Sequence, residues 1–257
     1  MSRQDEVNQS CYTADRVAST YLRTNLQIPE VMIYVKYCGE ICGGTVLDIG
    51  CGAGRTAVFL SRWAGKYTAI DYADRMVALC KERCPGIDCA VGDVRDMARF
   101  DDNVFDAVFF SNNGLDSLIH EDRLAGFREM HRVLKSGGLL VFSTHNRDYP
   151  GSRRKPDFRV AIDPCSTLRS LVRYWRCQSN RRRNREFERE EDCYGIINDP
   201  AHNYRLVTYY ISTSDQIEQL DSLGFGFVEA YDLGGDTIDV AAGNTTSPWI
   251  WYVARKR

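Results

Sequence analysis

Three glycines and three aspartates have types and spacings that suit a nucleoside ligand. The stretch DIGCGAG holds glycines at positions 50, 52 and 54 and begins with Asp48; Asp71 and Asp93 follow further along the chain. Glycine lets the backbone approach a ligand, because a Cβ would collide with it or forbid a positive φ. The Asp71 carboxylate can accept hydrogen bonds from both hydroxyls of a ribose, and Asp93 can meet the exocyclic amine of an adenine.

The glycine spacing argues against a dinucleotide as that ligand. A dinucleotide-binding turn carries the pattern G-x-G-x-x-G. Counting from Gly50, the third glycine would fall where the chain has Arg55. The observed pattern is G-x-G-x-G, so a nicotinamide-dependent dehydrogenase is not expected.

Alternating strands and helices must position these residues. Apolar runs predict strands over 45–50, 66–72, 87–93, 105–111 and 138–145. Helical periodicity predicts helices over 11–42, 55–64, 73–84 and 121–135. Strands that alternate with helices form a parallel sheet covered on both faces. The three aspartates then lie at the carboxyl ends of successive strands, which is the edge where open α/β sheets bind ligands.

Composition excludes several classes of protein. The chain has 257 residues, a net charge of −2 and 44% hydrophobic residues, which is typical of a globular domain and not of a disordered or globally basic protein. No stretch approaches the roughly 18–20 apolar residues of a membrane span. The polar first residues also lack the apolar core of a signal peptide. We therefore expect a soluble, cytoplasmic protein with no membrane partner.

The cysteines and histidines do not predict a metal site. Ten cysteines occur without a C-x-x-C pair, and the four histidines are scattered. A zinc site needs ligands at tight spacing. We expect reduced, mostly buried thiols and no metal, with regulatory or adventitious oxidation as the alternative.

Several stretches together resemble the class I S-adenosylmethionine-dependent methyltransferases. They are DIGCGAG (48–54), AIDYADRMV (69–77), AVGDVRDM (90–97), FDAVFFSNNGLD (105–116) and HRVLKSGGLLVFSTHN (131–146). The stretch WIWYVARK (249–256) is similar to the family's last, antiparallel strand, while Ser136 stands where the family often has proline. The resemblance implies an α/β fold with a doubly wound, mostly parallel seven-stranded sheet. Its last strand would be antiparallel, and a cap would be inserted between strands five and six.

The resemblance also implies a single methyltransferase domain over residues 1–257. An N-terminal helical cap would cover 1–44, and the cofactor-binding core would cover 45–146. An inserted substrate cap would cover 147–204 and roof the acceptor pocket. The C-terminal strands and helix would cover 205–257.

S-adenosyl-L-methionine is the cofactor that the resemblance implies, with S-adenosyl-L-homocysteine as product. The glycine turn would pass the methionine part, Asp71 would hold the ribose, and Asp93 would read the adenine. Met76 could instead be ordinary helix core. The family's cofactor contacts fall on Asp48, Gly50, Cys51, Gly52, Asp71, Tyr72, Met76, Asp93, Val94 and Ser111.

Candidates for the acceptor side follow the fourth and fifth strands. His145 is the first choice for a general base or an acceptor-orienting group, although it could instead bond a backbone carbonyl. His120 begins a helix and is expected to be structural. The other catalytic candidates are Asn112 and Asn146, and the weaker acceptor contacts are Asn113, Asp116, His202 and Tyr204.

An arginine-rich segment leaves three explanations open: nucleic-acid binding, binding of an anionic small substrate, and a solvated helix. Residues 169–189 hold eight arginines, and Tyr174 and Trp175 among them could stack on bases. Acidic residues follow at once, so that Arg182 and Glu186 lie within helical reach. A salt-bridged exposed helix is therefore the simpler explanation.

The leading hypothesis is methyl transfer to a nitrogen or oxygen atom of a small molecule, with no nucleic-acid partner. The alternative is an RNA or protein methyltransferase that docks through the arginine-rich segment. A third class, a binding protein without activity, is disfavoured by the intact glycine turn and Asp71. The sequence does not name the acceptor or the oligomeric state.

Overall fold

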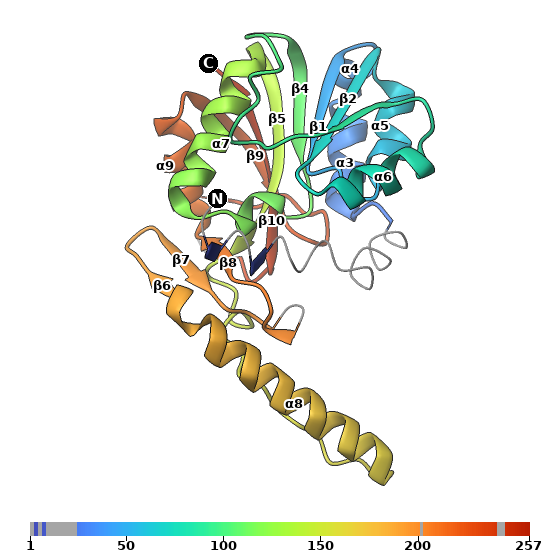
Figure 1. Cartoon of the computed structure of the whole chain (residues 1–257). Coiled ribbons are helices and arrows are strands. Elements are labelled where there is room, and N and C mark those ends of the chain that lie inside the picture. Colours follow the sequence, from blue (N-terminus) through green and yellow to red (C-terminus); the bar gives the residue numbers. More distant parts are fainter. Residues whose placement is uncertain (1–2, 5–6, 9–24, 201–202, 241–244) are drawn as a thin grey trace.

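A mixed β-sheet with helices on both faces forms the body of the protein (Figure 1). The computed structural model describes residues 3–4, 7–8, 25–200, 203–240 and 245–257. Five parallel strands form the central part of the sheet in the order β3-β2-β1-β4-β5. Their bounds are β1 Thr45–Ile49, β2 Lys66–Asp71, β3 Asp88–Val91, β4 Phe105–Phe110 and β5 Leu134–Asn146. The expected doubly wound α/β fold is confirmed.

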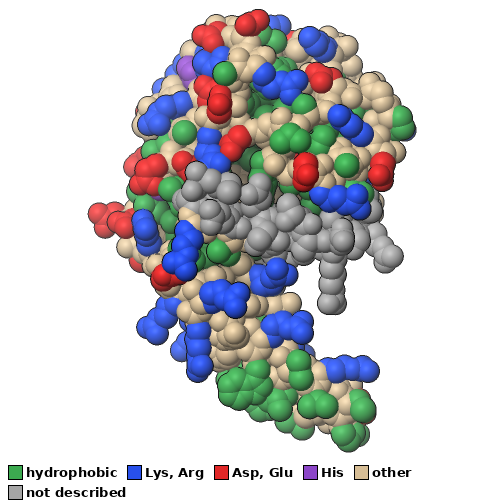
Figure 2. Space-filling view, in the orientation of Figure 1, with side chains coloured by type: hydrophobic (Ala, Val, Ile, Leu, Met, Phe, Trp, Pro, Cys, Tyr) green, Lys and Arg blue, Asp and Glu red, His purple; other side chains and the backbone are tan. Residues whose placement is uncertain are grey.

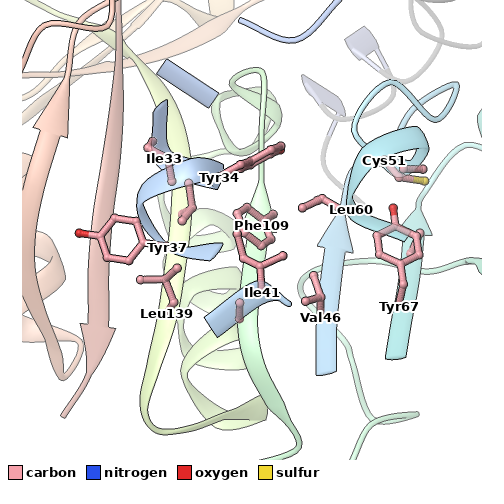
Figure 3. Close-up of a cluster of buried hydrophobic side chains, with 14 of the residues drawn as sticks. Ile33, Tyr34, Tyr37, Ile41, Val46, Cys51, Leu60, Tyr67, Phe109 and Leu139 are labelled. Carbon is pink, nitrogen blue, oxygen red and sulfur yellow. The ribbon is translucent and has the colours of Figure 1, made fainter. Parts of the chain in front are cut away.

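Side chains of the central strands alternate between two hydrophobic clusters, one on each face of the sheet. Val46 of β1 joins the cluster shown in Figure 3, whereas its neighbour Leu47 joins the opposite one. The first cluster packs under α3 (Ile28–Lys36), α4 (Cys38–Ile41), α5 (Ala57–Trp63) and α6 (Asp74–Arg83). The second packs under α7 (His120–Val133) and α9 (Thr213–Ser222).

The predicted boundaries agree with the central elements to within a few residues, except at β5. This strand begins at Leu134, four residues before the prediction, because Leu134 already pairs with Phe105 of β4. Of the predicted helical stretch 11–42, α3 and α4 are confirmed, while residues 11–24 lie outside the described residues.

In the described part of the chain the sheet has ten strands, three more than the seven predicted. Beyond β5 the order continues β8-β7-β6, and β10 pairs antiparallel with both β5 and β9. The buried YGII of β7 pairs with the buried TYYI of β8, so part of the insertion joins the sheet. The bounds are β6 Arg189–Glu190, β7 Tyr194–Ile197, β8 Thr208–Ile211, β9 Phe225–Tyr231 and β10 Trp249–Lys256.

The insertion also carries the long helix α8 (Pro164–Asn184), which projects away from the sheet (Figure 1). Asp163 caps its start by accepting hydrogen bonds from the backbone N–H groups of Cys165 and Ser166. The predicted exposed helix is present, but the predicted salt bridge between Arg182 and Glu186 is not formed among the described residues. The helix ends before Glu186, which lies on the short 3-10 helix η2 (Arg185–Phe187) and pairs with Arg3 instead, at 3.3 Å.

The nine described cysteines are free thiols, and five of them are buried. Cys51, Cys80 and Cys89 have Sγ atoms within 4.8 Å of one another, a clustering that the sequence spacing did not predict. Among the described ranges, every helix is too short or too polar to traverse a bilayer.

Candidate functional site

A pocket opens where the central strands end, as the sequence predicted. Its walls come from the segments that follow β1, β2, β3 and β4, and from η1 (Gly114–Ser117). The structure brings ten of the predicted site residues together there. They are Gly50, Cys51, Gly52, Asp71, Tyr72, Met76, Asp93, Val94, Ser111 and Asn112.

Asp71 links the glycine turn to the end of β2. One carboxylate oxygen accepts a hydrogen bond from the backbone N–H of Gly52, and the other accepts one from the N–H of Ala73, each at 2.9 Å. Gly50 and Gly52 both have positive φ values, of 62° and 53°, which a side chain would strain. Burial raises the pKa of Asp71 to about 6, although these N–H groups oppose the rise.

Asp48 lies behind the pocket rather than in its wall. Its Oδ2 accepts hydrogen bonds from the hydroxyls of Thr56, at 2.6 Å, and Tyr67, at 2.7 Å. Its Oδ1 is buried and has no hydrogen-bond partner among the described residues. Burial raises the pKa of Asp48 to about 6. Because Thr56 lines the pocket, Asp48 reaches the pocket through that hydroxyl.

Asp93 is already paired with a cation in the wall of the pocket. Its carboxylate accepts from the backbone N–H and the guanidinium of Arg95, with a shortest distance of 2.6 Å. Arg95 also pairs with Asp122 at 2.6 Å. Although burial opposes the change, the hydrogen bonds from Arg95 lower the pKa of Asp93 below its ordinary value. A ligand amine at Asp93 would share that carboxylate with Arg95.

Arg55 and Glu30 form a buried ion pair beside the glycine turn, which the sequence reasoning missed. The two Arg55 terminal nitrogens bond the two Glu30 oxygens, one of them at 2.7 Å. Arg55 also lines the pocket, where its charge is compensated by Glu30. The one sequence feature that could have indicated this role is the position of Arg55 directly after DIGCGAG.

The described N-terminal residue Asn8 is a second pocket residue that the sequence did not indicate. Its side-chain amide donates to the carbonyls of Ser117, at 2.8 Å, and Val207, at 3.1 Å. It therefore ties the wall of the pocket formed by η1 to the segment before β8. No local pattern in the sequence marks this contact, because its partners are 109 and 199 residues away.

His145 and Asp116 form a dyad at the end of β5, outside the residues that line the pocket. The Asp116 Oδ2 accepts from the His145 backbone N–H and from its Nδ1, both at 2.7 Å. A carboxylate only accepts hydrogen bonds, so Nδ1 carries the proton and Nε2 is the free acceptor. The imidazole lies near the rings of Tyr210 and Trp249, with centroid distances of 4.9 and 5.8 Å.

Asp116 was predicted to contact the acceptor, but the structure shows it buried and committed to other side chains. Besides His145, it accepts from Arg123 at 2.5 Å and from the Thr144 hydroxyl at 2.6 Å. Arg123 has no exposed surface, and its guanidinium also donates to Gln216 at 2.7 Å. Asp116 therefore acts on any acceptor only through His145.

The remaining predicted residues that the structure describes do not line the pocket. The fully buried Asn146 donates its amide hydrogens to the carbonyls of Thr245 and Ser247, so its amide holds that turn. Asn113 is buried after β4, and its backbone N–H donates to the Ser143 hydroxyl at 2.8 Å. Tyr204 is also buried and donates to the Arg154 carbonyl at 2.7 Å. His202 lies outside the described residues.

The predicted roof over the acceptor pocket stays a prediction, because the pocket at the strand ends is lined by the predicted cofactor residues. None of the residues that line the pocket comes from 147–200 or 203–204. The longest element of the insertion, α8, points away from the body instead (Figure 1).

Part of the chain is similar to a known protein family. Residues 46–138 match the family described as the methyltransferase domain. A ubiquinone biosynthesis O-methyltransferase of Xanthomonas oryzae is 35% identical over 124 residues, which cover 46% of this chain and 50% of that protein. This chain therefore spans about half the length of the curated relatives it matches.

Solved structures with the same fold cover nearly the whole chain. An S-adenosylmethionine-dependent methyltransferase from Mesorhizobium loti has a TM-score of 0.61 at 19% identity, covering 89% of this chain and 98% of that one. The 1,6-didemethyltoxoflavin-N1-methyltransferase of Burkholderia thailandensis, solved with its substrate and S-adenosylhomocysteine, has a TM-score of 0.63 at 14% identity. It covers 98% of this chain and is itself covered to 88%. At these identities the likeness establishes the fold.

Proposed function

We propose that this chain is a class I S-adenosylmethionine-dependent methyltransferase that transfers a methyl group to a nitrogen or oxygen atom of a small molecule. The observation that carries the proposal is the pocket at the carboxyl ends of the strands. Gly52, Asp71 and Asp93 all line it, and these are the residue types that suit a nucleoside ligand. The named functions of the similar proteins, O- and N-methyl transfer to small molecules, support the same class of reaction.

The residues of the pocket fit S-adenosylmethionine in charge and space. The Asp71 carboxylate lies beside the glycine turn and can accept hydrogen bonds from the ribose hydroxyls. A Cβ added at Gly52 would meet no atom of the described residues within 4 Å, so among them space remains open over the turn. When bound, S-adenosylmethionine supplies an activated methyl group.

Methyl transfer is an in-line displacement, so alignment of donor and acceptor carries most of the rate enhancement. Alignment can supply about 7–11 kcal/mol. The rigid strand ends that hold Asp71 and Asn112 would fix the donor side. On the acceptor side we assign His145 as the general base or orienting group. Its free Nε2 can take a proton while Asp116 holds the ring.

Replacing Gly52 with alanine is expected to weaken S-adenosylhomocysteine binding by tenfold or more. The new methyl group would project into the open space over the turn, where the ligand has to pass. Gly86→Ala is the matched control, because Gly86 also has a positive φ, of 88°, and no protein atom within 4 Å of an added Cβ. Both changes should cost a similar strain of about 1–2 kcal/mol in unfolding free energy.

Calorimetric titration of both variants separates strain from blocking of the site. We expect Gly86→Ala to bind S-adenosylhomocysteine like the wild type. Equal affinity of the two variants would show that the ligand does not pass over Gly52, and the proposal would fail.

A further inference from the structure

The projecting part of the insertion has no counterpart in the proposed catalysis. We call residues 158–185 the arm; it consists of the segment before α8, the helix itself and Arg185. The arm extends from the body past all other elements (Figure 1). Residues at its root contact the body, where Asn184 donates to the carbonyls of Tyr204 and Arg205, both at 3.1 Å. The outer half has no such partner among the described residues.

An apolar stripe covers the outer half of the arm. Leu168, Leu171, Val172 and Trp175 recur at the spacing i, i+3, i+4, i+7, which places them on one face of α8. They are 61%, 36%, 52% and 59% exposed, and the neighbouring Phe158, Val160 and Ile162 are exposed as well. Figure 2 shows these hydrophobic side chains gathered at the end of the arm. A contiguous exposed apolar patch of this kind marks an interaction surface.

The arm is also strongly cationic. It holds one acidic residue, Asp163, against eight arginines. Within the described part of the chain, one of these arginines forms an ion pair. Arg173 pairs with Asp157 at the long distance of 4.0 Å. The acidic residues that follow are used elsewhere, since Glu190 pairs with Arg147 and Arg153. The arginines are Arg159, Arg169, Arg173, Arg176, Arg181, Arg182, Arg183 and Arg185.

We propose that the arm binds the surface of an anionic lipid bilayer. The apolar stripe would enter the boundary between headgroups and acyl chains, and the flanking arginines would contact lipid phosphates. The positive charge of the arginines favours an anionic partner. The exposed apolar stripe favours a partner with an apolar interior in which it can be buried. The interaction is peripheral, and it replaces the sequence-based expectation of no membrane partner. It does not depend on the methyltransferase activity.

Two other partners fit the arm less well. If the arms of two copies of the chain paired, the eight arginines of one arm would lie close to the eight of the other. Like charges at short range repel, so this pairing is disfavoured. A nucleic acid would satisfy the arginines, and Trp175 could stack on a base, but the other three residues of the stripe, Leu168, Leu171 and Val172, are aliphatic and offer no ring for stacking.

Vesicle flotation of the full-length chain tests the proposal. The vesicles contain either phosphatidylcholine alone or equal parts of phosphatidylcholine and phosphatidylglycerol. We expect the protein to float with the anionic vesicles and to remain behind with the neutral ones. Failure to float with either would overturn the proposal.

Two sets of variants assign the binding to the arm. The triple change Arg169→Gln, Arg173→Gln and Arg176→Gln should weaken binding about a hundredfold, since each cation near an anionic surface contributes about fivefold. Leu168→Ser together with Trp175→Ser should weaken it tenfold or more through lost apolar burial. The matched control removes three exposed cations of the body, by Arg62→Gln, Lys66→Gln and Arg75→Gln, and should float like the wild type.

Thermal melting checks that each variant is folded, and the exposed positions should leave the midpoint nearly unchanged. Undiminished flotation of either arm variant would contradict the proposal. If the protein does not float but retards RNA in a gel, and if the arginine changes abolish that retardation while the stripe changes do not, the arm would bind nucleic acid instead. A concentration-dependent dimer that the stripe changes abolish, again without flotation, would assign it to a second copy of the chain.

Discussion

Replacing His145 with alanine is expected to lower kcat by a factor of about 10²–10⁴, which is the usual contribution of a general acid or base. The imidazole Nδ1 is held by Asp116 at 2.7 Å, which leaves Nε2 to receive the acceptor proton. The affinity for S-adenosylhomocysteine should change little, because His145 does not line the pocket. The measurement is turnover with an acceptor found by screening metabolites for methyl uptake, together with calorimetry of the product.

His120→Ala is the matched control for this prediction. His120 also bonds one side chain through Nδ1, the hydroxyl of Tyr209 at 2.9 Å, and stacks on Tyr194. It should leave kcat close to the wild-type value. Asp116→Asn should shift the pH profile of kcat, because Asp116 acts by positioning the imidazole. Wild-type turnover of His145→Ala would remove His145 from the reaction.

Replacing Arg123 with methionine is expected to lower the free energy of unfolding by about 3–5 kcal/mol. Arg123 is fully buried, and its partner Asp116 is 1% exposed. The pair is joined at 2.5 Å, and Gln216 and Thr144 complete the guanidinium's hydrogen bonds. Methionine would fill the space but leave the Asp116 charge buried without its guanidinium partner. Urea denaturation followed by circular dichroism measures the loss.

Arg257→Met provides the control for the buried pair. Arg257 bonds Asp221 at 2.6 Å, but both side chains are more than half exposed. Solvent screens such a pair, so its loss should cost less than about 1 kcal/mol. Equal destabilisation by the two changes would show that the Arg123 network does not hold the end of β5 in place.

Features of the fold that depend on residues close together in the sequence could be predicted from the sequence. The strand and helix alternation follows from local apolar patterns, and the ends of β1, β2 and β4 follow from it. The glycine turn and Asp71 were predicted to meet because parallel strands end at one edge of the sheet. The resemblance then supplied Tyr72, Met76 and Val94, which the structure also places in the pocket wall.

Features that depend on packing between distant segments were not predictable in the same way. Arg55, in the turn before α5, pairs with Glu30 of α3, and Asp116, Arg123 and His145 come together from three different elements. The addition of β7 to the sheet requires pairing with β8, which no local pattern specifies. Because α8 ends before Glu186, the expected salt bridge with Arg182 is not formed, and the arginines of α8 are left without acidic partners on the helix.

The pH dependence of cofactor binding follows from the buried carboxyls. Asp71 and Asp48 both have a pKa of about 6, raised by burial. Ribose hydroxyls donate to the ionised form of Asp71, so affinity should rise with pH through 6 and level off above it. At pH 5 about one-tenth of Asp71 is ionised, which predicts an affinity about tenfold weaker than at pH 8.

Calorimetric titration of the wild-type chain with S-adenosylhomocysteine and with NAD, at pH 5 and pH 8, tests the central claim most directly. The account predicts that S-adenosylhomocysteine binds at one site, more weakly at pH 5, and that NAD does not bind. Asp71→Ala should weaken the binding by about 1.5–3 kcal/mol at pH 8, through the loss of a charge-assisted hydrogen bond. Binding of NAD without binding of S-adenosylhomocysteine would contradict the account.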